Sequence, residues 1–216
     1  RITFDGTLGV LRQTPMVAIR RCRNTNHGES MSPMKSLSVA LSIMAFSNPA
    51  FAENVEIYVV DMLDNIQIGY CIDIAKGRGA DATPDAGLQA HTCYSPSGEV
   101  LVDQAFDPDK FADGVLYMPE FDVCMQAPST EVGASADLAA CDGSVAQSWV
   151  FDGEGMITPV SAQEMCLTLT GETRTGRSDE NQMIAMTLQA CSDEQAAYQT
   201  WSNRTAEETR SRGRNE

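Results

Sequence analysis

Three copies of one sequence pattern constrain the fold of this chain more than any other feature. In each copy, a cysteine is followed by a polar loop and then by glutamine, one variable residue and an aromatic ring. The ring is a tryptophan in two copies, which use both tryptophans of the sequence, and a phenylalanine in the first. The glutamines lie 43 and 52 residues apart, so a repeated supersecondary unit is expected to set the fold. The copies are Cys93 with Gln104-Ala-Phe106, Cys141 with Gln147-Ser-Trp149, and Cys191 with Gln199-Thr-Trp201.

A second cysteine precedes each copy, inside a short stretch in which apolar and polar residues alternate. Such stretches, bounded by glycine and proline turns, are typical of paired strands. The cysteine spacings within the copies are 22, 17 and 25 residues. Pairing within each copy is the simplest of the fifteen connectivities that six cysteines allow. These pairs are Cys71–Cys93, Cys124–Cys141 and Cys166–Cys191.

The combined pattern resembles the ricin B-type lectin domain, the Gln-x-Trp family of β-trefoils, from about Asp64 to Asn203. The resemblance implies an all-β fold, a β-trefoil of three pseudo-symmetric repeats with four strands each and a disulfide within each repeat. We expect this domain over residues 64–203, after an N-terminal segment at 53–63 and before a polar, frayed tail at 204–216. The expected repeats are about 64–114, 115–156 and 157–203.

The aromatic rings that end the three triplets are expected to be core residues, where truncation of one ring to alanine costs about 3–5 kcal/mol. The glutamines that begin the triplets have two interpretations. They contact a bound sugar, or they form structural hydrogen bonds to the neighbouring loop. The structural set is Gln104, Phe106, Gln147, Trp149, Gln199 and Trp201.

Sugar recognition needs a carboxylate or amide that takes paired hydrogen bonds from vicinal hydroxyls, and a flat ring that covers an apolar sugar face. In the family that the chain resembles, these groups occupy fixed positions relative to the repeat cysteines. Repeat one matches this arrangement best, although a histidine stands where a larger aromatic platform is expected. An alternative interpretation of its key aspartate is a surface residue beside a turn. The implied sugar-binding residues are Asp73, Gln89, His91, Asp103 and Gln104.

Repeats two and three depart further from the family pattern. Repeat two has Gln126 in place of the aspartate and no aromatic platform, so weak binding is expected there. Repeat three has Thr168 at the same position and is expected to be structural. The function that follows is a secreted, non-catalytic module that binds carbohydrate or a glycoconjugate mainly through repeat one. The alternative is a degenerate trefoil that binds an envelope or extracellular protein, for example as an inhibitor.

The sequence ahead of residue 53 has the form of an export signal. A basic segment, an 11-residue apolar stretch and small residues up to Ala52 make residues 31–52 a typical secretory signal peptide. The apolar stretch is too short for a bilayer, which needs about 20 residues. We expect translation to start at Met31 or Met34, with residues 1–30 as an upstream extension; a genuine extended leader is the alternative. Cleavage near Ala52 would deliver the protein to the periplasm or the cell exterior.

Charge and composition argue against several other functions. Residues 53–216 contain 9 basic and 28 acidic residues, a net charge of −19, which disfavours nucleic acid and anionic membranes as partners. With one histidine in this part and no Gly-x-Ser-x-Gly, nucleophilic catalysis lacks its components, so neither catalytic residues nor a cofactor are expected. The acidic loop at 107–113 lacks the ligand spacing of a Ca²⁺ loop, so no metal site is expected.

Overall fold

The computed structural model describes residues 52–66 and 68–212, which belong to a compact unit spanning residues 48–216. The expected upstream extension and the expected signal peptide, apart from its last residue, lie outside the described residues. Within the described ranges, no helix has the length and apolar character needed to cross a membrane.

Most strands of the described chain are short, because glycine and proline turns interrupt it at close intervals. Two short helices, α1 (Ala196–Gln199) and α2 (Ala206–Arg212), lie near the C-terminal end. The strands are β1 (Glu56–Val59), β2 (Tyr70–Ile74), β3 (Leu88–Thr92), β4 (Tyr117–Met118), β5 (Val123–Gln126), β6 (Asp137–Ala140), β7 (Trp149–Val150), β8 (Glu154–Met156), β9 (Thr158–Pro159), β10 (Met165–Thr175), β11 (Gln182–Ala190) and β12 (Thr200–Arg204).

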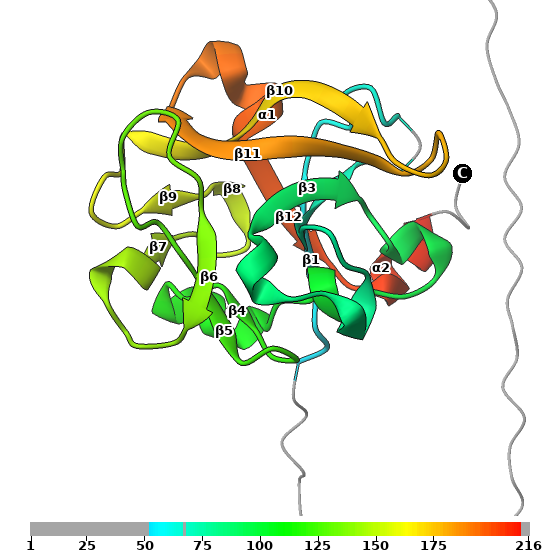
Figure 1. Ribbon diagram of the computed structural model, residues 1–216, viewed down its shortest axis with the longest axis horizontal. Helices are drawn as coiled ribbons and strands as arrows, with labels where there is room; N and C mark the ends of the chain where they lie inside the picture. The colour runs from blue at the N-terminus through cyan, green and yellow to red at the C-terminus, as the bar shows by residue number, and fades with distance from the viewer. Residues whose placement is uncertain (1–51, 67, 213–216) are drawn as a thin grey trace, which may run out of the picture. The chain divides into compact units, whose positions relative to one another are not determined.

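These strands form one large sheet and two small ones (Figure 1). The large sheet has seven strands in the order β10-β11-β3-β2-β1-β12-β8, so it joins repeat three to repeat one. Repeat two contributes the separate sheet β4-β5-β6, and β7 pairs with β9. In repeat one, the segment expected to form the fourth strand makes only an isolated β-bridge, between Phe106 and Val55.

Each repeat is centred on a hairpin that carries one disulfide. The hairpins are β2–β3, β5–β6 and β10–β11, and the second cysteine of each pair follows the second strand directly. The Cα atoms of the paired cysteines lie 5.0, 5.1 and 5.0 Å apart, within the normal range for a disulfide. The expected all-β trefoil with three disulfides within repeats is therefore confirmed. The bridges are Cys71–Cys93, Cys124–Cys141 and Cys166–Cys191.

Each triplet glutamine forms hydrogen bonds on both sides of the second cysteine of its repeat. Its side-chain oxygen accepts from the backbone N–H that follows the cysteine, at 3.2 Å for Gln104, 2.8 Å for Gln147 and 2.9 Å for Gln199. Its side-chain nitrogen donates to the carbonyl that precedes the cysteine, at 3.1, 2.9 and 3.0 Å in the same order. All three glutamines are buried, so backbone groups replace water as the hydrogen-bond partners of their amides.

The triplet rings fix the first strand of each hairpin from the core side. The indole N–H of Trp149 donates to the Met125 carbonyl at 2.8 Å, and that of Trp201 donates to the Leu167 carbonyl at 2.9 Å. Both acceptors belong to the residue after the first repeat cysteine. Phe106 is equally buried but has no donor for the matching bond in repeat one.

The domain extends beyond both of its expected limits. The segment 53–63 contributes β1, which pairs with β12 and β2, and Ile57 and Val59 of this strand are fully buried. The trefoil therefore begins before residue 64, because an alternation of buried apolar residues continues through β1.

The expectation of a frayed tail from residue 204 is wrong for the described residues. Arg204 ends β12, and its Nε lies 2.6 Å from Glu56 Oε1 in a buried ion pair. Helix α2 then starts with reciprocal capping, since Glu208 N–H donates to Thr205 Oγ1 and Thr205 N–H donates to Glu208 Oε2. The Thr-x-x-Glu spacing at 205–208 is a sequence signal for the start of this helix. A prediction from polar composition alone does not use it.

We expect Arg204→Ala to lower the free energy of unfolding by about 3–5 kcal/mol, because it leaves the Glu56 carboxylate buried without its partner. Urea unfolding of both proteins measures the difference. The matched control is Arg174→Ala, which removes an exposed arginine of β10 and should change stability by less than about 0.5 kcal/mol. An equally small effect of Arg204→Ala would show that the ion pair contributes nothing to the fold.

Candidate functional site

The structure brings the five sugar-binding residues expected in repeat one together. Asp73 lies on β2, Gln89 and His91 lie on β3, and Asp103 and Gln104 belong to a 3-10 helix at Val102–Gln104. Together these residues form the repeat-one cluster. Asp73 and Gln89 are direct partners in the β2–β3 register, so the strand pairing itself places their side chains on one face.

Two amides hold the Asp73 carboxylate at the centre of the cluster. Gln89 Nε2 donates to one carboxylate oxygen at 3.0 Å, and Gln104 Nε2 donates to the other at 3.1 Å. Asp73 is only 1 % exposed, so these are the groups that replace water around it. Gln104 forms the expected structural hydrogen bonds around Cys93, and its contact with a sugar stays a prediction.

The Asp103 carboxylate is buried without such partners. Neither of its oxygens accepts a hydrogen bond from any described residue, although the residue is fully buried. Burial raises the pKa of Asp103, and the nearby backbone amides of Gly79 and of Asp103 itself oppose that shift without forming aligned hydrogen bonds. A buried acceptor without a donor costs about 1–3 kcal/mol. The cluster thus contains two oxygens that can still accept hydrogen bonds.

His91 connects the cluster to a hairpin from repeat three. Its Nδ1 lies 3.0 Å from the Thr92 carbonyl oxygen, and its Nε2 lies 2.6 Å from Asn181 Oδ1. The Thr92 carbonyl only accepts, so the Nδ1–H of His91 donates to it. His91 also faces the Asp73 and Asp103 carboxylates, whose pKa values it lowers.

The hairpin end, defined as residues 170–183 of the β10–β11 hairpin, covers the repeat-one cluster. β11 lies beside β3 (Figure 1), and the two strands pair with Met183 opposite His91 and Ile184 opposite Ala90. Thr92 Oγ1 also donates to the Glu180 carbonyl at 2.8 Å. As a result His91 is only 8 % exposed. Asp73 is buried as well, so its interpretation as a surface residue beside a turn is wrong.

Tyr94 and Arg78 extend the cluster toward solvent, and the sequence pattern missed both. The rings of Tyr94 and His91 have centroids 5.6 Å apart, and the Arg78 guanidinium carbon lies 5.5 Å from the centre of the Tyr94 ring. Tyr94 is half-buried, and burial raises the pKa of its phenol. Tyr94 directly follows Cys93, which is the sequence signal that could have identified this second aromatic ring.

Burial also dominates the electrostatics of Asp73. Burial raises the pKa of Asp73 to about 7, and the Asp103 carboxylate adds to the shift. His91 and the hydrogen bonds from the two glutamine amides oppose it by stabilising the charged form. Asp73 therefore changes charge near neutral pH.

Repeats two and three lack a buried carboxylate at the position that corresponds to Asp73. In repeat two, Gln126 lies opposite the exposed Asp137. In repeat three, the Thr168 hydroxyl is saturated, because it donates to the Cys166 carbonyl and accepts from Gln199 Nε2. A groove of about 360 Å³ nevertheless lies beside Thr168, and the half-exposed Tyr198 forms part of its wall.

The described residues offer no convincing metal centre. The group with suitable ligand spacing is Glu56 with Cys71 and Cys93. Both cysteines are in a disulfide, and Glu56 binds Arg204 and the Ser95 backbone N–H. The acidic loop at 107–113 forms a 3-10 helix, which Asp107 caps by accepting from the Asp109 N–H.

Comparisons with known proteins place this geometry in context. A family model described as the ricin-type beta-trefoil lectin domain matches residues 60–201, about two thirds of the chain. A comparison with curated protein sequences found no significant match. Among solved structures, the designed threefold-symmetric protein ThreeFoil is 15 % identical over 69 % of this chain and 96 % of its own, with a TM-score of 0.48.

Two natural lectin structures are similar to the same degree. The C-terminal half of an earthworm R-type lectin, in complex with GalNAc, is 16 % identical over 71 % of this chain and all of its own, with a TM-score of 0.45. The β-trefoil lectin of the Vibrio vulnificus hemolysin/cytolysin, with N-acetyl-D-lactosamine bound, is 14 % identical over 71 % of this chain and 94 % of its own, with a TM-score of 0.43.

We expect the free energy of unfolding to fall as the pH rises from about 4 to about 7. In this window folded Asp73 keeps a proton that the unfolded chain has lost, since its folded pKa is raised to about 7. One such group gives a slope of at most about 1.4 kcal/mol per pH unit. Urea unfolding at stepped pH measures the slope.

The slope should become smaller in Asp73→Asn and stay unchanged in Asp137→Asn, the exposed counterpart on β6. Equal slopes in the native chain and in Asp73→Asn would contradict the assignment of this titration to Asp73.

Proposed function

This chain belongs to the ricin-type beta-trefoil lectin domain family, and we propose that it is a secreted, non-catalytic module that binds carbohydrate through repeat one. The observation that carries the proposal is the repeat-one cluster: a carboxylate held by two amides, beside two buried carboxylate oxygens that have no donor. Family membership supports carbohydrate as the ligand, and the cluster supports the choice of repeat.

A polyol has the chemistry that this cluster lacks. Sugar hydroxyls donate hydrogen bonds to carboxylates and accept them from amides, so vicinal hydroxyls would supply the donors missing at Asp103. The tilted rings of His91 and Tyr94 offer apolar faces beside these acceptors. Ligand entry would thereby relieve the cost of two unsatisfied buried oxygens.

Access to the cluster requires the hairpin end to move away from repeat one. Its side-chain contacts there are polar: Asn181 meets His91, Thr92 meets the Glu180 carbonyl, and Thr173 meets Tyr70. Most residues of the hairpin end are exposed, so its separation from β3 would uncover little apolar surface. Segments with few buried apolar contacts open locally at low free-energy cost.

Export is the second part of the proposal. Three disulfides are typical of proteins that mature in oxidising compartments, and the expected cleavage position near Ala52 lies just ahead of β1. Each disulfide closes a loop of about 20 residues, for which the chain-entropy model gives about 3 kcal/mol. Such covalent stabilisation suits a small domain outside the cell.

A second candidate function is protein binding without sugar recognition. The burial of Asp73 and His91 favours it, since a cluster that stays closed would serve only to dock the hairpin end on repeat one. In that case the exposed loops of the trefoil would carry the interaction.

We expect a glycan array with residues 53–216 to show binding, and Asp73→Asn to weaken it at least tenfold. The substitution keeps the shape of the side chain but exchanges a hydrogen-bond acceptor for a donor. Asn181→Ala should have the opposite effect and strengthen binding about fivefold, because it removes one hydrogen bond that holds the hairpin end over the site. Titration calorimetry with the best glycan measures both changes.

Asp152→Asn, at an exposed aspartate outside both candidate sites, is the matched control for the aspartate change and should leave binding unchanged. Binding that survives Asp73→Asn would move the site out of repeat one. If folded, oxidised protein binds no glycan, the lectin proposal fails, and the protein-binding alternative is the one to pursue.

A further inference from the structure

A groove beside repeat two combines an aromatic ring with unpaired polar side chains at a place where the family pattern puts no sugar site. We infer that this groove, named here the Tyr117 groove, binds one neutral hexose unit of a glycan. The inference rests on the proposed function, because it takes carbohydrate as the ligand of this chain. It adds a second binding position, so that the molecule could hold two sugar units at once.

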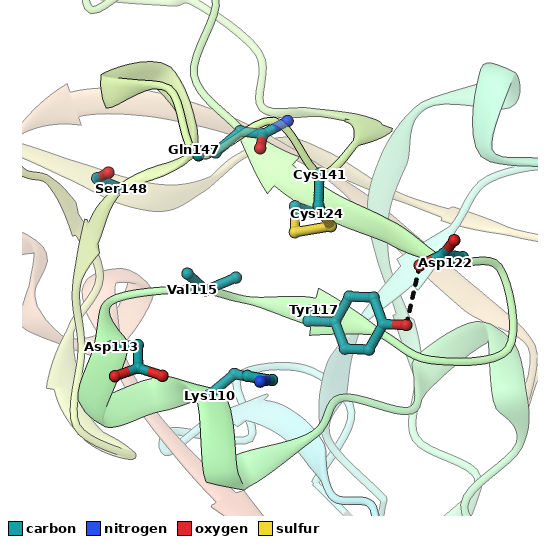
Figure 2. Close-up of a pocket in the computed structure, with 10 residues that line it drawn as sticks. Lys110, Asp113, Val115, Tyr117, Asp122, Cys124, Cys141, Gln147 and Ser148 are labelled. Atoms are coloured by element: carbon teal, nitrogen blue, oxygen red, sulfur yellow. Dashed lines mark hydrogen bonds between the residues drawn. A yellow bond between two sulfur atoms is a disulfide. The ribbon is translucent and has the colours of Figure 1, made fainter.

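The Tyr117 groove has the size of a small-ligand site. Its volume is about 430 Å³, within the range of roughly 300–1,000 Å³ that is usual for such sites. Its walls come from the 3-10 helix Pro108–Asp113, from β4 and β5, and from the segment between Cys141 and Ser148. Figure 2 shows the Tyr117 ring between the Cys124–Cys141 disulfide and Lys110.

An apolar surface with a fixed aromatic ring lines one part of the groove. The Tyr117 hydroxyl donates to Asp122 Oδ1 at 3.0 Å, which holds the half-buried ring in one orientation. Val115 and the disulfide continue the apolar surface beside the ring. A ring fixed before binding loses little conformational entropy when the C–H face of a sugar packs against it.

Polar groups of both kinds lie along the remaining wall. Lys110 and Asp113 are exposed and line the groove, and neither side chain forms a hydrogen bond or ion pair with another described residue. The ammonium group only donates and the carboxylate only accepts. A hydroxyl group does both, so adjacent hydroxyls of one sugar ring match this pair.

The charges of the groove select against anionic ligands. An anion would meet the Asp113 and Asp122 carboxylates on a chain with a net charge of −15. A neutral hexose avoids this repulsion. The charge, the apolar ring surface and the polar groups of the groove therefore all fit a neutral hexose.

The Tyr117 groove differs from the family's sugar position in repeat two. That position would use Gln126, Asp137, Ala139 and the pair Ala146-Gln147, and of these residues only Gln147 lines the groove. Tyr117 lies on β4, opposite Cys124, and so precedes the strand that carries the family residues. Gln147 does line the groove, but its side-chain oxygen and nitrogen are both engaged by backbone groups around Cys141.

The test is an NMR titration of the full chain with methyl glucoside, methyl galactoside and methyl mannoside, following the ring signals of Tyr117 and His91. We expect at least one of the three hexosides to shift the Tyr117 signals in a saturable way. Lys110→Ala and Asp113→Ala should each weaken this binding at least fivefold, as loss of one charge-assisted hydrogen bond predicts. In Tyr117→Ala, the same hexoside should no longer shift the Lys110 signals.

Tyr117→Phe is the conservative control, since it keeps the ring that packs on the sugar and should bind within about threefold of the native chain. Tyr198→Ala, which alters the groove of repeat three, should leave the Tyr117 shifts unchanged. Thermal unfolding of each variant checks that its fold is intact.

The outcomes separate the two proposals. If no hexoside shifts Tyr117, or if the shifts are the same in Lys110→Ala and Asp113→Ala, the inference is overturned, whatever occurs at His91. Shifts at His91 alone support sugar binding in repeat one and reject the second position. Shifts at Tyr117 alone support this inference and count against repeat one.

Discussion

The fold depends on one buried side-chain amide in each repeat. Gln104, Gln147 and Gln199 each bridge the two backbone groups on either side of a cysteine, at the point where the chain leaves its hairpin. The disulfide fixes the same point covalently, and the ring two residues beyond the glutamine fills the core. Hydrogen bonding, covalent linkage and apolar packing therefore act at one place in each repeat, which explains why this pattern stays recognisable when the rest of the repeat does not.

The three repeats use this common frame differently. In repeat one the bridging glutamine also donates to the Asp73 carboxylate, whereas in repeat three it donates to the Thr168 hydroxyl. A carboxylate at this position needs further hydrogen-bond donors and places a titratable group in the interior. A threonine hydroxyl donates instead to a backbone carbonyl two residues away. The same frame thus holds a carboxylate in repeat one and a hydroxyl in repeat three. The long hairpin of repeat three packs against β3, beside the repeat-one cluster.

Much of this structure follows from the sequence, and the exceptions have a common cause. Cysteine spacing and the triplets carry the family resemblance, and that resemblance sufficed to predict the trefoil, its disulfides and the meeting of Asp73 with Gln89 and Gln104. The disulfides and the contacts of Asp73 are each formed within one repeat. The burial of His91 by Asn181 depends on a hairpin 90 residues away, and the place of Arg204 depends on Glu56 at the other end of the domain. Such contacts between distant segments leave no periodic signal in either segment. Thr205 and Glu208 are different, because their capping pattern was present but outweighed by polar composition.

The antiparallel pairing of β1 with β12 has a mechanical consequence. The start of β1 and the end of β12 lie side by side, with Glu56 opposite Arg204. A load applied across these two ends would separate the strands one residue pair at a time, as a zipper opens, and would not shear all their hydrogen bonds at once. The Val55–Phe106 bridge and helix α2 must come away before this seam is loaded, and the first pair of the seam is then the buried ion pair. When this domain is tethered between two bodies, the disulfides limit how far each repeat can extend after the seam has opened.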